Sequence, residues 1–331
     1  WYKGIEIYRV PINTKFGIHY GEKKEYISLV KKLANKSDIL INTSTETATT
    51  DILLGHLKEI DIPKILYLHG RYDFPFKGEF SKGISIMKKL YFNFRWSVFY
   101  AINGKKYSSY NRIINLLQED EATQYFNRYV NKIDIIHNFV EKDKFNASNL
   151  NKKNQIICVA NYSNLKNQIE VLDVFYNAKL KDYKLVFIGS EENEYCKRLE
   201  RRASELFGEK QNTVDIRYNI SRSDLAKSVK ESKLFLFCSK IEKLPVSILE
   251  AMACKTMYLA MDVGSIKYVS GGVVVQNKDE MINWLRKLSN DEKLMSQYGE
   301  IGCEQIKKYY NFDVENEKLQ NIIDELIVGE G

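Results

Sequence analysis

The feature that most constrains the fold of this chain is a regular alternation of short apolar runs with longer amphipathic stretches. Short apolar runs separated by segments of helical length are typical of parallel sheets covered by helices. The pattern therefore predicts an α/β protein. A chain of 331 residues is longer than a single core usually organises, so we expect two Rossmann-like domains of about 150 residues each.

The predicted strands fall into two groups on either side of a polar stretch, Asn146–Asn154, which predicts domains at 1–150 and 151–331. In the first half the strands are Ile5–Val10, Asp38–Asn42, Lys64–His69 and Lys132–His137. In the second half they are Gln155–Ala160, Lys184–Gly189, Thr213–Arg217, Lys233–Cys238, Met257–Ala260 and Gly272–Val275. Helices are expected at Asn277–Leu288, Asp291–Tyr309 and Asp313–Ile327. No strand with a glycine-rich turn precedes Ile5, and residue 1 is Trp, so we expect an opening strand to lie before the sequence shown.

Charge is distributed unevenly between the two halves. Residues 1–150 carry the whole net charge of +7, and the remainder sums to zero. The excess favours an anionic partner for the first half, although lysines that only solubilise the protein explain it equally well. No nucleic-acid-binding motif accompanies the charge, so no nucleic acid is expected. The five cysteines are widely spaced without a C-x-x-C pair, which predicts buried thiols rather than disulfides or a zinc site.

The strongest local signal runs from Ser239 to Cys254, directly after a predicted strand. Pro245 suits the first turn of a helix, where its missing N–H has no helical partner. The amides of Val246 and Ser247 then point out of the positive end of the helix, which is an anion site suited to a diphosphate. Glu250 is the one charge on the apolar stretch from Val246 to Cys254, so it requires hydrogen-bond donors. A ribose diol supplies two donors; a partner within the protein is the alternative.

The spacing Glu242-x₇-Glu250, with the Leu-Glu-Ala-Met-Ala run around the second glutamate, resembles the E-x₇-E motif of retaining GT-B glycosyltransferases (glycosyltransferase family 4-like). Further segments are similar to that family and extend the resemblance over most of the chain: Ile136–Val140, Ile157–Asn167, Leu185–Gly189, Ser223–Ala226, Ala260–Gly264 and Tyr310–Asp313. The resemblance implies a GT-B fold, with two Rossmann-like domains facing a cleft. It also implies an N-terminal domain that binds the acceptor, a C-terminal domain that binds the nucleotide sugar, and a last helix that crosses back to the N-terminal domain.

The resemblance also implies roles for individual residues. Glu250 binds the ribose, Glu242 binds hydroxyls of the donor sugar, and Lys166 neutralises the leaving diphosphate. His69, at the end of a predicted strand, lies near the donor sugar and acceptor in such enzymes; a structural role for it stays open. The predicted catalytic residues are therefore His69, Glu242 and Lys166, and the predicted donor-binding residues are Asn161, Lys166, Glu242, Lys243, Leu244, Val246, Ser247 and Glu250.

The chain departs from the family pattern at several positions. Asn161 stands where the family often has Arg, and Lys243 replaces a small residue after the first glutamate. Lys255, Lys267 and Tyr268 replace familiar Gly, Pro and Glu. Lys243 either supplies a missing cation or obstructs the sugar. These departures leave open a degenerate, non-catalytic transferase that acts as a partner subunit.

Residues 80–100 suggest how the acceptor is reached. Lys82, Lys88, Lys89 and Arg95 accompany five aromatic residues between Tyr91 and Phe99. Basic and aromatic residues at helical spacing suit an interfacial helix on an anionic membrane, but the same aromatics also suit a core face. Lys88, Lys89 and Arg95 are thus predicted to form an acceptor or membrane surface.

The predicted reaction is the transfer of a sugar from a UDP- or GDP-sugar to a glycan or lipid-linked acceptor, with retained anomeric configuration. No metal and no cofactor are expected, because the chain has no D-x-D pair or ligand cluster. The alternative of the same fold is a sugar-nucleotide epimerase, whereas a nicotinamide oxidoreductase is disfavoured because no G-x-G-x-x-G follows a strand. No apolar run reaches the length of a membrane span, so a cytoplasmic enzyme of polysaccharide biosynthesis is expected, with peripheral association with the inner face of the membrane as a further expectation.

Overall fold

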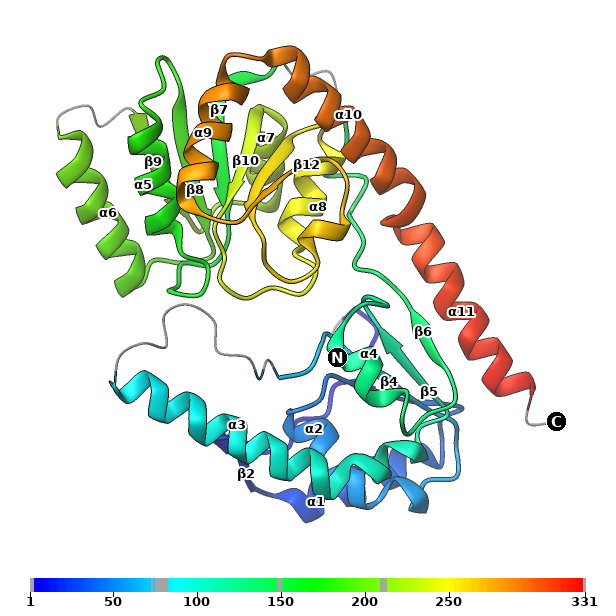
Figure 1. The fold of residues 1–331 in the computed structure, drawn as a ribbon. Coiled ribbons are helices and arrows are strands. Elements are labelled where there is room, and N and C mark those ends of the chain that lie inside the picture. Colours follow the sequence, from blue (N-terminus) through cyan, green and yellow to red (C-terminus); the bar gives the residue numbers. More distant parts are fainter. Residues whose placement is uncertain (1–2, 73, 75–82, 148–150, 209–212, 330–331) are drawn as a thin grey trace. The chain divides into compact units, whose positions relative to one another are not determined.

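The computed structural model describes residues 3–72, 74, 83–147, 151–208 and 213–329. The chain forms two compact units, each described here by itself (Figure 1). The N-terminal unit comprises Trp1–Ile136 and Lys318–Gly331, and the C-terminal unit comprises His137–Glu317. Each unit contains a parallel β-sheet, as the α/β pattern predicts.

The C-terminal unit is built on a six-stranded parallel sheet with the order β12-β11-β10-β7-β8-β9. The strands are β7 (Lys153–Val159), β8 (Lys184–Gly189), β9 (Val214–Tyr218), β10 (Ser232–Phe237), β11 (Met257–Met261) and β12 (Gly272–Val275). Read from β9, this is the doubly wound Rossmann order, in which the direction of winding reverses between the first and fourth strands. The switch point therefore lies between β7 and β10.

Helices cover both faces of this sheet (Figure 1). They are α5 (Gln168–Ala178), α6 (Glu194–Phe207), α7 (Arg222–Lys230), α8 (Val246–Ala253), α9 (Lys278–Ser289) and α10 (Glu292–Tyr309), with the short 3₁₀ helix η5 (Ile266–Tyr268). Several begin at side-chain caps: Asn193 accepts from two amides of α6, Asn277 caps α9 and Asp291 caps α10. The inner parts of three strands, Ile156–Val159 of β7, Leu234–Phe237 of β10 and Met257–Ala260 of β11, are buried on both sides, and their sequences are wholly apolar.

The N-terminal unit contains a four-stranded parallel sheet with the order β3-β4-β5-β6 and an antiparallel hairpin, β1–β2. The strands are β1 (Ile12–Lys15), β2 (Ile18–Gly21), β3 (Leu40–Thr43), β4 (Lys64–Tyr67), β5 (Arg112–Asn115) and β6 (Ile133–Ile135). The helices are α1 (Lys23–Ala34), α2 (Ala48–Asp51), α3 (Gly83–Asn103) and α4 (Glu121–Phe126), with 3₁₀ helices η1 (Leu53–Gly55), η2 (Leu57–Glu59) and η3 (Gly104–Ser109).

Two predictions for the first half of the chain need correction. Ile5–Val10 forms no strand: Ile5, Ile7 and Tyr8 are exposed, and the hairpin that follows begins at Ile12. In the described part of the segment only Ile5 takes part in a bridge, so its apolar alternation alone does not make a strand. Conversely, β5 occupies a short segment that the pattern did not single out, because its run of apolar residues is too brief to be distinctive.

The chain divides between Ile136 and His137, earlier than the polar stretch at 146–154 indicates. Residues just after the division pair within the C-terminal unit: Val140 bridges Asn311, and both the backbone N–H and the ring of His137 contact the buried carboxylate of Glu315. The last helix, α11 (Phe312–Val328), begins in that unit and ends in the other, where Ile322 packs with Ile65, Ile114 and Ile136.

The cysteines are buried thiols, as predicted, and three of the histidines have partners within the fold. All five cysteines are buried and free. His19 lies between Thr14 and Asp51, and His56 contacts Glu59, so these rings have partners within the fold, as His137 does.

Candidate functional site

A cleft of about 590 Å³ opens at the switch point of the C-terminal unit. Its walls come from the segments that follow β7, β8 and β10 and from the first turns of α7 and α8. In doubly wound sheets, ligands bind outside the carboxyl ends of the strands at this position. The lining includes Pro245 and seven of the eight residues predicted to bind a donor, all but Lys243: Asn161, Lys166, Glu242, Leu244, Val246, Ser247 and Glu250.

The loop after β7 presents Lys166 to the cleft. Buried Gln168 donates from its amide to the carbonyls of Ala160 and Asn161, and the amides of Lys166 and Asn167 donate to Ser163. The Lys240 amide donates to the Leu165 carbonyl at 2.8 Å, which joins this loop to the segment after β10. As a result, Lys166 Nζ lies 2.5 Å from Glu242 Oε1, and the two residues form an ion pair on the cleft wall.

Helix α8 begins at Val246, with Pro245 as its N-cap residue in extended conformation. The amides of Ile248 and Leu249 donate to the Pro245 carbonyl. Among the described residues, the amides of Val246 and Ser247 have no acceptor, and both residues line the cleft. The helix thus directs two unpaired donors and the positive end of its dipole into the cleft, which is suited to an anion.

Glu250 lies one turn further along α8 and is only 3% exposed. Its Oε1 accepts a hydrogen bond from the Arg222 guanidinium, so the protein supplies one of the donors that its burial requires. Burial raises the pKa of Glu250, an effect that Arg222 partly opposes. Within the described parts of the chain, Oε2 has no partner, so one carboxylate oxygen is available to a ligand.

Arg222 is the site residue that the sequence interpretation missed. It is the first residue of α7, lines the cleft, and stacks on Phe145 with 4.5 Å between the guanidinium carbon and the ring centre. A cation in the first turn of a helix is disfavoured by the dipole, so an arginine directly after the Ser221 N-cap is the signal that points to a specific partner.

Two further contacts shape the loop before α8. Asn138 donates from its amide to the Leu244 carbonyl at 2.8 Å, and the Ser265 amide donates to the Lys243 carbonyl. Lys243 is not among the residues that line the cleft, and its contact with the donor stays a prediction. The Lys243 backbone instead connects the loop to the segment after β11.

His69 lies in the N-terminal unit, just beyond β4. The residue is exposed, its ring is 5.5 Å from that of Tyr67, and partial desolvation lowers its pKa. A ring with a lowered pKa is mostly neutral near pH 7, where one nitrogen accepts and the other donates hydrogen bonds.

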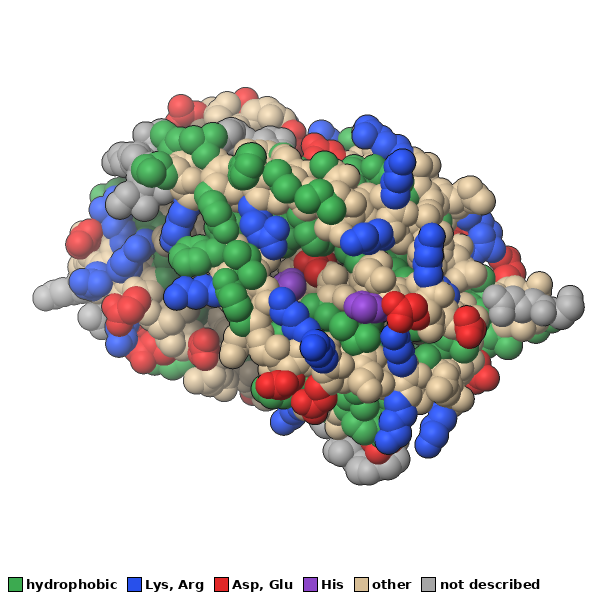
Figure 2. Space-filling view, turned by 90° about the horizontal axis from the view of Figure 1, so that it is seen from below, with side chains coloured by type: hydrophobic (Ala, Val, Ile, Leu, Met, Phe, Trp, Pro, Cys, Tyr) green, Lys and Arg blue, Asp and Glu red, His purple; other side chains and the backbone are tan. Residues whose placement is uncertain are grey.

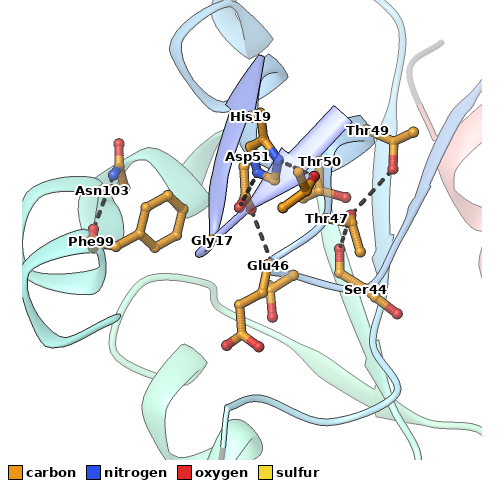
Figure 3. Close-up of polar contacts among 12 residues, drawn as sticks. Gly17, His19, Ser44, Glu46, Thr47, Thr49, Thr50, Asp51, Phe99 and Asn103 are labelled. Atoms are coloured by element: carbon orange, nitrogen blue, oxygen red, sulfur yellow. Dashed lines mark hydrogen bonds and ion pairs between the residues drawn. The ribbon is translucent and has the colours of Figure 1, made fainter. Parts of the chain in front are cut away.

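The neighbouring loop after β3 is held in a strained conformation. Ser44 and Glu46 have φ angles of 61° and 64°, which is uncommon for residues with a side chain. The Asp51 carboxylate accepts from the Glu46 amide and contacts the His19 ring, while the Glu46 side chain points away from this pair (Figure 3). The Glu46 carboxylate accepts from the Tyr72 amide and the Tyr100 hydroxyl. This network fixes the ends of β3 and β4.

The predicted basic surface on α3 is only partly present. Lys88 is exposed, but Lys89 is 7% exposed and lies over the Tyr72 ring, so it does not belong to a surface. Arg95 donates to the Gly17 carbonyl and stacks on Trp96. Lys82 falls outside the described residues. The helix uses its cations to cover aromatic rings, because long side chains bury their stems and rings attract ammonium groups.

In the described chain, no helix is both long and apolar enough to cross a membrane.

Solved structures with the same fold cover nearly the whole chain. S. aureus TarM aligns with 93% of it at 17% identity and a TM-score of 0.68, and the chain spans 59% of the length of TarM. Sucrose-phosphate synthase from Thermosynechococcus elongatus gives a TM-score of 0.72 at 14% identity, covering 92% of this chain and 78% of that one. Anabaena HepE, solved with UDP, gives 0.70 at 13% identity, covering 91% and 82%. A comparison with curated proteins gives no match.

These likenesses, together with the doubly wound sheet and the cleft at its switch point, define an α/β protein of the GT-B class. The model of the family described as glycosyl transferases group 1 matches residues 140–305, which is half of the chain. The chain belongs to this family.

Proposed function

We propose that this protein is a retaining glycosyltransferase that transfers a sugar from a UDP-sugar to a glycan or lipid-linked acceptor without a divalent cation. The observation that carries the proposal is the gathering of Lys166, Glu242, Glu250 and the free amides of α8 around one cleft. HepE is solved with UDP, and a trehalose-phosphate synthase of this fold from Burkholderia xenovorans is described as UDP-forming, which supports a UDP-sugar over a GDP-sugar as the donor.

The cleft matches the parts of such a donor. Val246 and Glu250 are four residues apart on one helix, or about 6 Å along its axis, which suits a phosphate and a ribose of one nucleotide. The free Oε2 of Glu250 accepts from the ribose, and the amides of Val246 and Ser247 donate to the diphosphate. Lys166 and Glu242 form an ion pair with each other. When a donor binds, the Lys166 ammonium turns to the diphosphate and the Glu242 carboxylate turns to the sugar hydroxyls.

In the proposed reaction, the bond between the anomeric carbon and the diphosphate oxygen breaks, and the bonding electrons leave with the diphosphate. The acceptor oxygen forms the new bond on the same face, and its proton passes to the departing diphosphate. Lys166 and the α8 amides stabilise the negative charge that develops there, so no metal ion is required for this role. His69 is proposed to orient the acceptor or the donor sugar as a neutral hydrogen-bonding group.

The acceptor is proposed to be reached at a membrane surface through α3. Large apolar side chains line one exposed face of this helix at helical spacing: Met87, Leu90, Tyr91, Phe94, Val98 and Ile102. Hydrophobic side chains lie beside lysine and arginine side chains on the face seen in Figure 2. An exposed apolar stripe with nearby cations suits anionic lipid. The opposite face of α3, with Trp96 and Tyr100, belongs to the core.

Calorimetry with UDP, followed by assay of UDP release from UDP-sugars with and without EDTA, tests the proposal. Replacing Glu250 with Gln is expected to weaken UDP binding by about 1.5–3 kcal/mol, because a hydrogen bond to a charged group is lost. Glu194→Gln, a change of the same kind at an exposed position, serves as the control.

UDP release that stops in EDTA and returns with magnesium contradicts the electrostatic role of Lys166. If incubation without any acceptor converts the UDP-sugar into an epimerised UDP-sugar, the epimerase alternative is favoured.

A further inference from the structure

A second pocket, of about 620 Å³, lies in the N-terminal unit and shares no lining residue with the cleft of the C-terminal unit. It is formed by the segment after β4, by the middle of α3 and by α4, which follows β5. The segments after β4 and β5 leave the carboxyl ends of parallel strands, the edge at which α/β sheets bind ligands. The volume is within the usual range for small-molecule sites.

Two arginines of this pocket surround one aromatic ring. The guanidinium carbon of Arg71 lies 4.5 Å from the ring centre of Tyr125 and 5.1 Å from that of Tyr100. The guanidinium carbon of Arg128 lies 6.0 Å from the Tyr125 ring centre, and Arg128 is exposed. The rings hold the two cations in place, because the faces of aromatic rings attract guanidinium groups.

Neither guanidinium has an anionic partner within hydrogen-bond reach in the described residues, and Arg71 Nε is buried without an acceptor. Two negative side chains lie nearby: Glu121 lines the pocket, and Glu46 interacts with Arg71 through space while its own hydrogen bonds go to Tyr72 and Tyr100. The lining itself holds two cations, Arg71 and Arg128, against one carboxylate, Glu121, and Arg71 keeps an unused N–H donor. Planar guanidinium groups match the oxygens of phosphates and carboxylates.

The rest of the lining is suited to a sugar ring. Tyr125 and Tyr129 offer aromatic surface, and Ser97 and Gln124 offer neutral hydrogen-bonding groups for hydroxyls. We propose that this pocket binds the acceptor, and that the acceptor is an anionic sugar whose phosphate or carboxylate contacts Arg71 and Arg128. The inference rests on the proposed function, since it names the class of acceptor, and it fits the net charge of +7 that residues 1–150 carry.

Binding of glucose 6-phosphate, glucuronate and glucose to the 331-residue chain tests the inference, with UDP present so that the donor cleft is occupied. Saturation-transfer NMR is suited to such weak ligands. We expect at least one of the anionic sugars to bind about fivefold or more tightly than glucose, and the stronger of the two identifies phosphate or carboxylate as the preferred group. Equal binding of all three sugars overturns the proposal.

Arg128→Gln carries the mutational test, because an exposed side chain is replaced without disturbing the core. It is expected to weaken binding of the anionic sugar on the order of fivefold, with glucose unaffected. Arg9→Gln removes the same charge from an exposed position of the same unit and should leave the affinity unchanged. Arg71→Gln should act more strongly, with thermal unfolding measured because Arg71 packs on Phe74 and Tyr100. If Arg128→Gln and Arg9→Gln bind equally well, the pocket is not an anion site.

UDP affinity, measured separately by calorimetry, distinguishes this proposal from the proposed function. Loss of anionic-sugar binding in Arg128→Gln with normal UDP binding supports the acceptor pocket. Absence of UDP binding in the wild type contradicts the proposed donor site. The effect of Arg128→Gln on the binding of anionic sugars is still measurable by NMR in that case.

Discussion

At the scale of single residues, the pair of Glu250 and Arg222 links stability to pH. The folded-state pKa of Glu250 is raised above its ordinary value of 4.5, mainly by burial. Such a carboxyl contributes stability that is fully present below the ordinary value and is lost as the pH rises through the folded-state pKa. Near neutral pH, burial of the Glu250 carboxylate lowers the stability of the folded protein, which is consistent with a role of this residue in binding.

We expect the melting temperature of the wild type, relative to a Glu250→Gln variant, to rise as the pH is lowered from about 7 to about 5. The variant has no carboxyl to protonate at this position and lacks the effect. Differential scanning fluorimetry at both pH values measures it. Glu194→Gln, at a side chain that is 86% exposed, should show no such dependence on pH. A relative melting temperature that falls on acidification would contradict the raised pKa.

Arg222→Gln is expected to lower the free energy of unfolding at neutral pH by about 1–3 kcal/mol, because it leaves a buried carboxylate without its cation. This loss of unfolding free energy is smaller than that expected for a fully buried ion pair, because the Arg222 side chain is 40% exposed. Urea unfolding at neutral pH and at about pH 5 measures it, and the loss should shrink at the lower pH as Glu250 is protonated. An equal loss at both pH values would place the effect in the packing on Phe145 instead.

At the scale of elements, the cleft depends on loops that are fixed against one another. Gly264, after β11, has a φ of 59°, and a Cβ added there would lie 2.2 Å from the Glu242 carbonyl oxygen. The loop that carries Glu242 therefore packs directly on a glycine. Its position is set by backbone contact as well as by its ion pair with Lys166.

Gly264→Ala is expected to lower stability by about 1–3 kcal/mol and to weaken UDP-sugar binding, because the loop of Glu242 must shift. Gly208→Ala is the control: its φ is also positive, 54°, but an added Cβ meets no atom within 4 Å. Thermal unfolding and calorimetry should show lower stability in both variants but weaker donor binding only in Gly264→Ala. Normal donor affinity in Gly264→Ala would mean that the Glu242 loop accommodates the change.

At the scale of the whole molecule, the exposed face of α3 predicts a dependence on lipid. Phe94 and Ile102 are 72% and 66% exposed, and burial of one such side chain contributes about 1.5–3 kcal/mol. The double variant Phe94→Ser and Ile102→Ser should therefore reduce flotation with anionic vesicles by at least about tenfold. Val328→Ser, at an exposed apolar position on α11, should float like the wild type. Flotation of the double variant at the wild-type level would assign these side chains to ordinary surface.

The sequence predicted the C-terminal unit more closely than the N-terminal one, for a physical reason. A strand buried on both faces, such as β8, is a continuous apolar run with sharp ends, and its predicted bounds match the structure. The predicted bounds of the edge strand β12, an apolar run that starts at Gly272, also match. The short strands of the N-terminal unit lie beside exposed apolar segments such as Ile5–Val10, so hydrophobic pattern alone does not separate strand from surface. The helices predicted to start at Asn277 and Asp291 begin one residue later, because these two side chains are the N-caps of α9 and α10.

By itself, the sequence determined the α/β class, the helix that follows Pro245, and the placement of Glu242 before that helix and of Glu250 on it, because these depend on local periodicity and on backbone chemistry near one residue. Only the tertiary structure decided which side chains meet. Arg222 reaches Glu250 across 28 positions, Lys166 reaches Glu242 across 76, and Arg71 and Arg128 meet at Tyr125. Such contacts are set by sheet order and loop packing, which bring distant segments together and leave no periodic trace in the sequence.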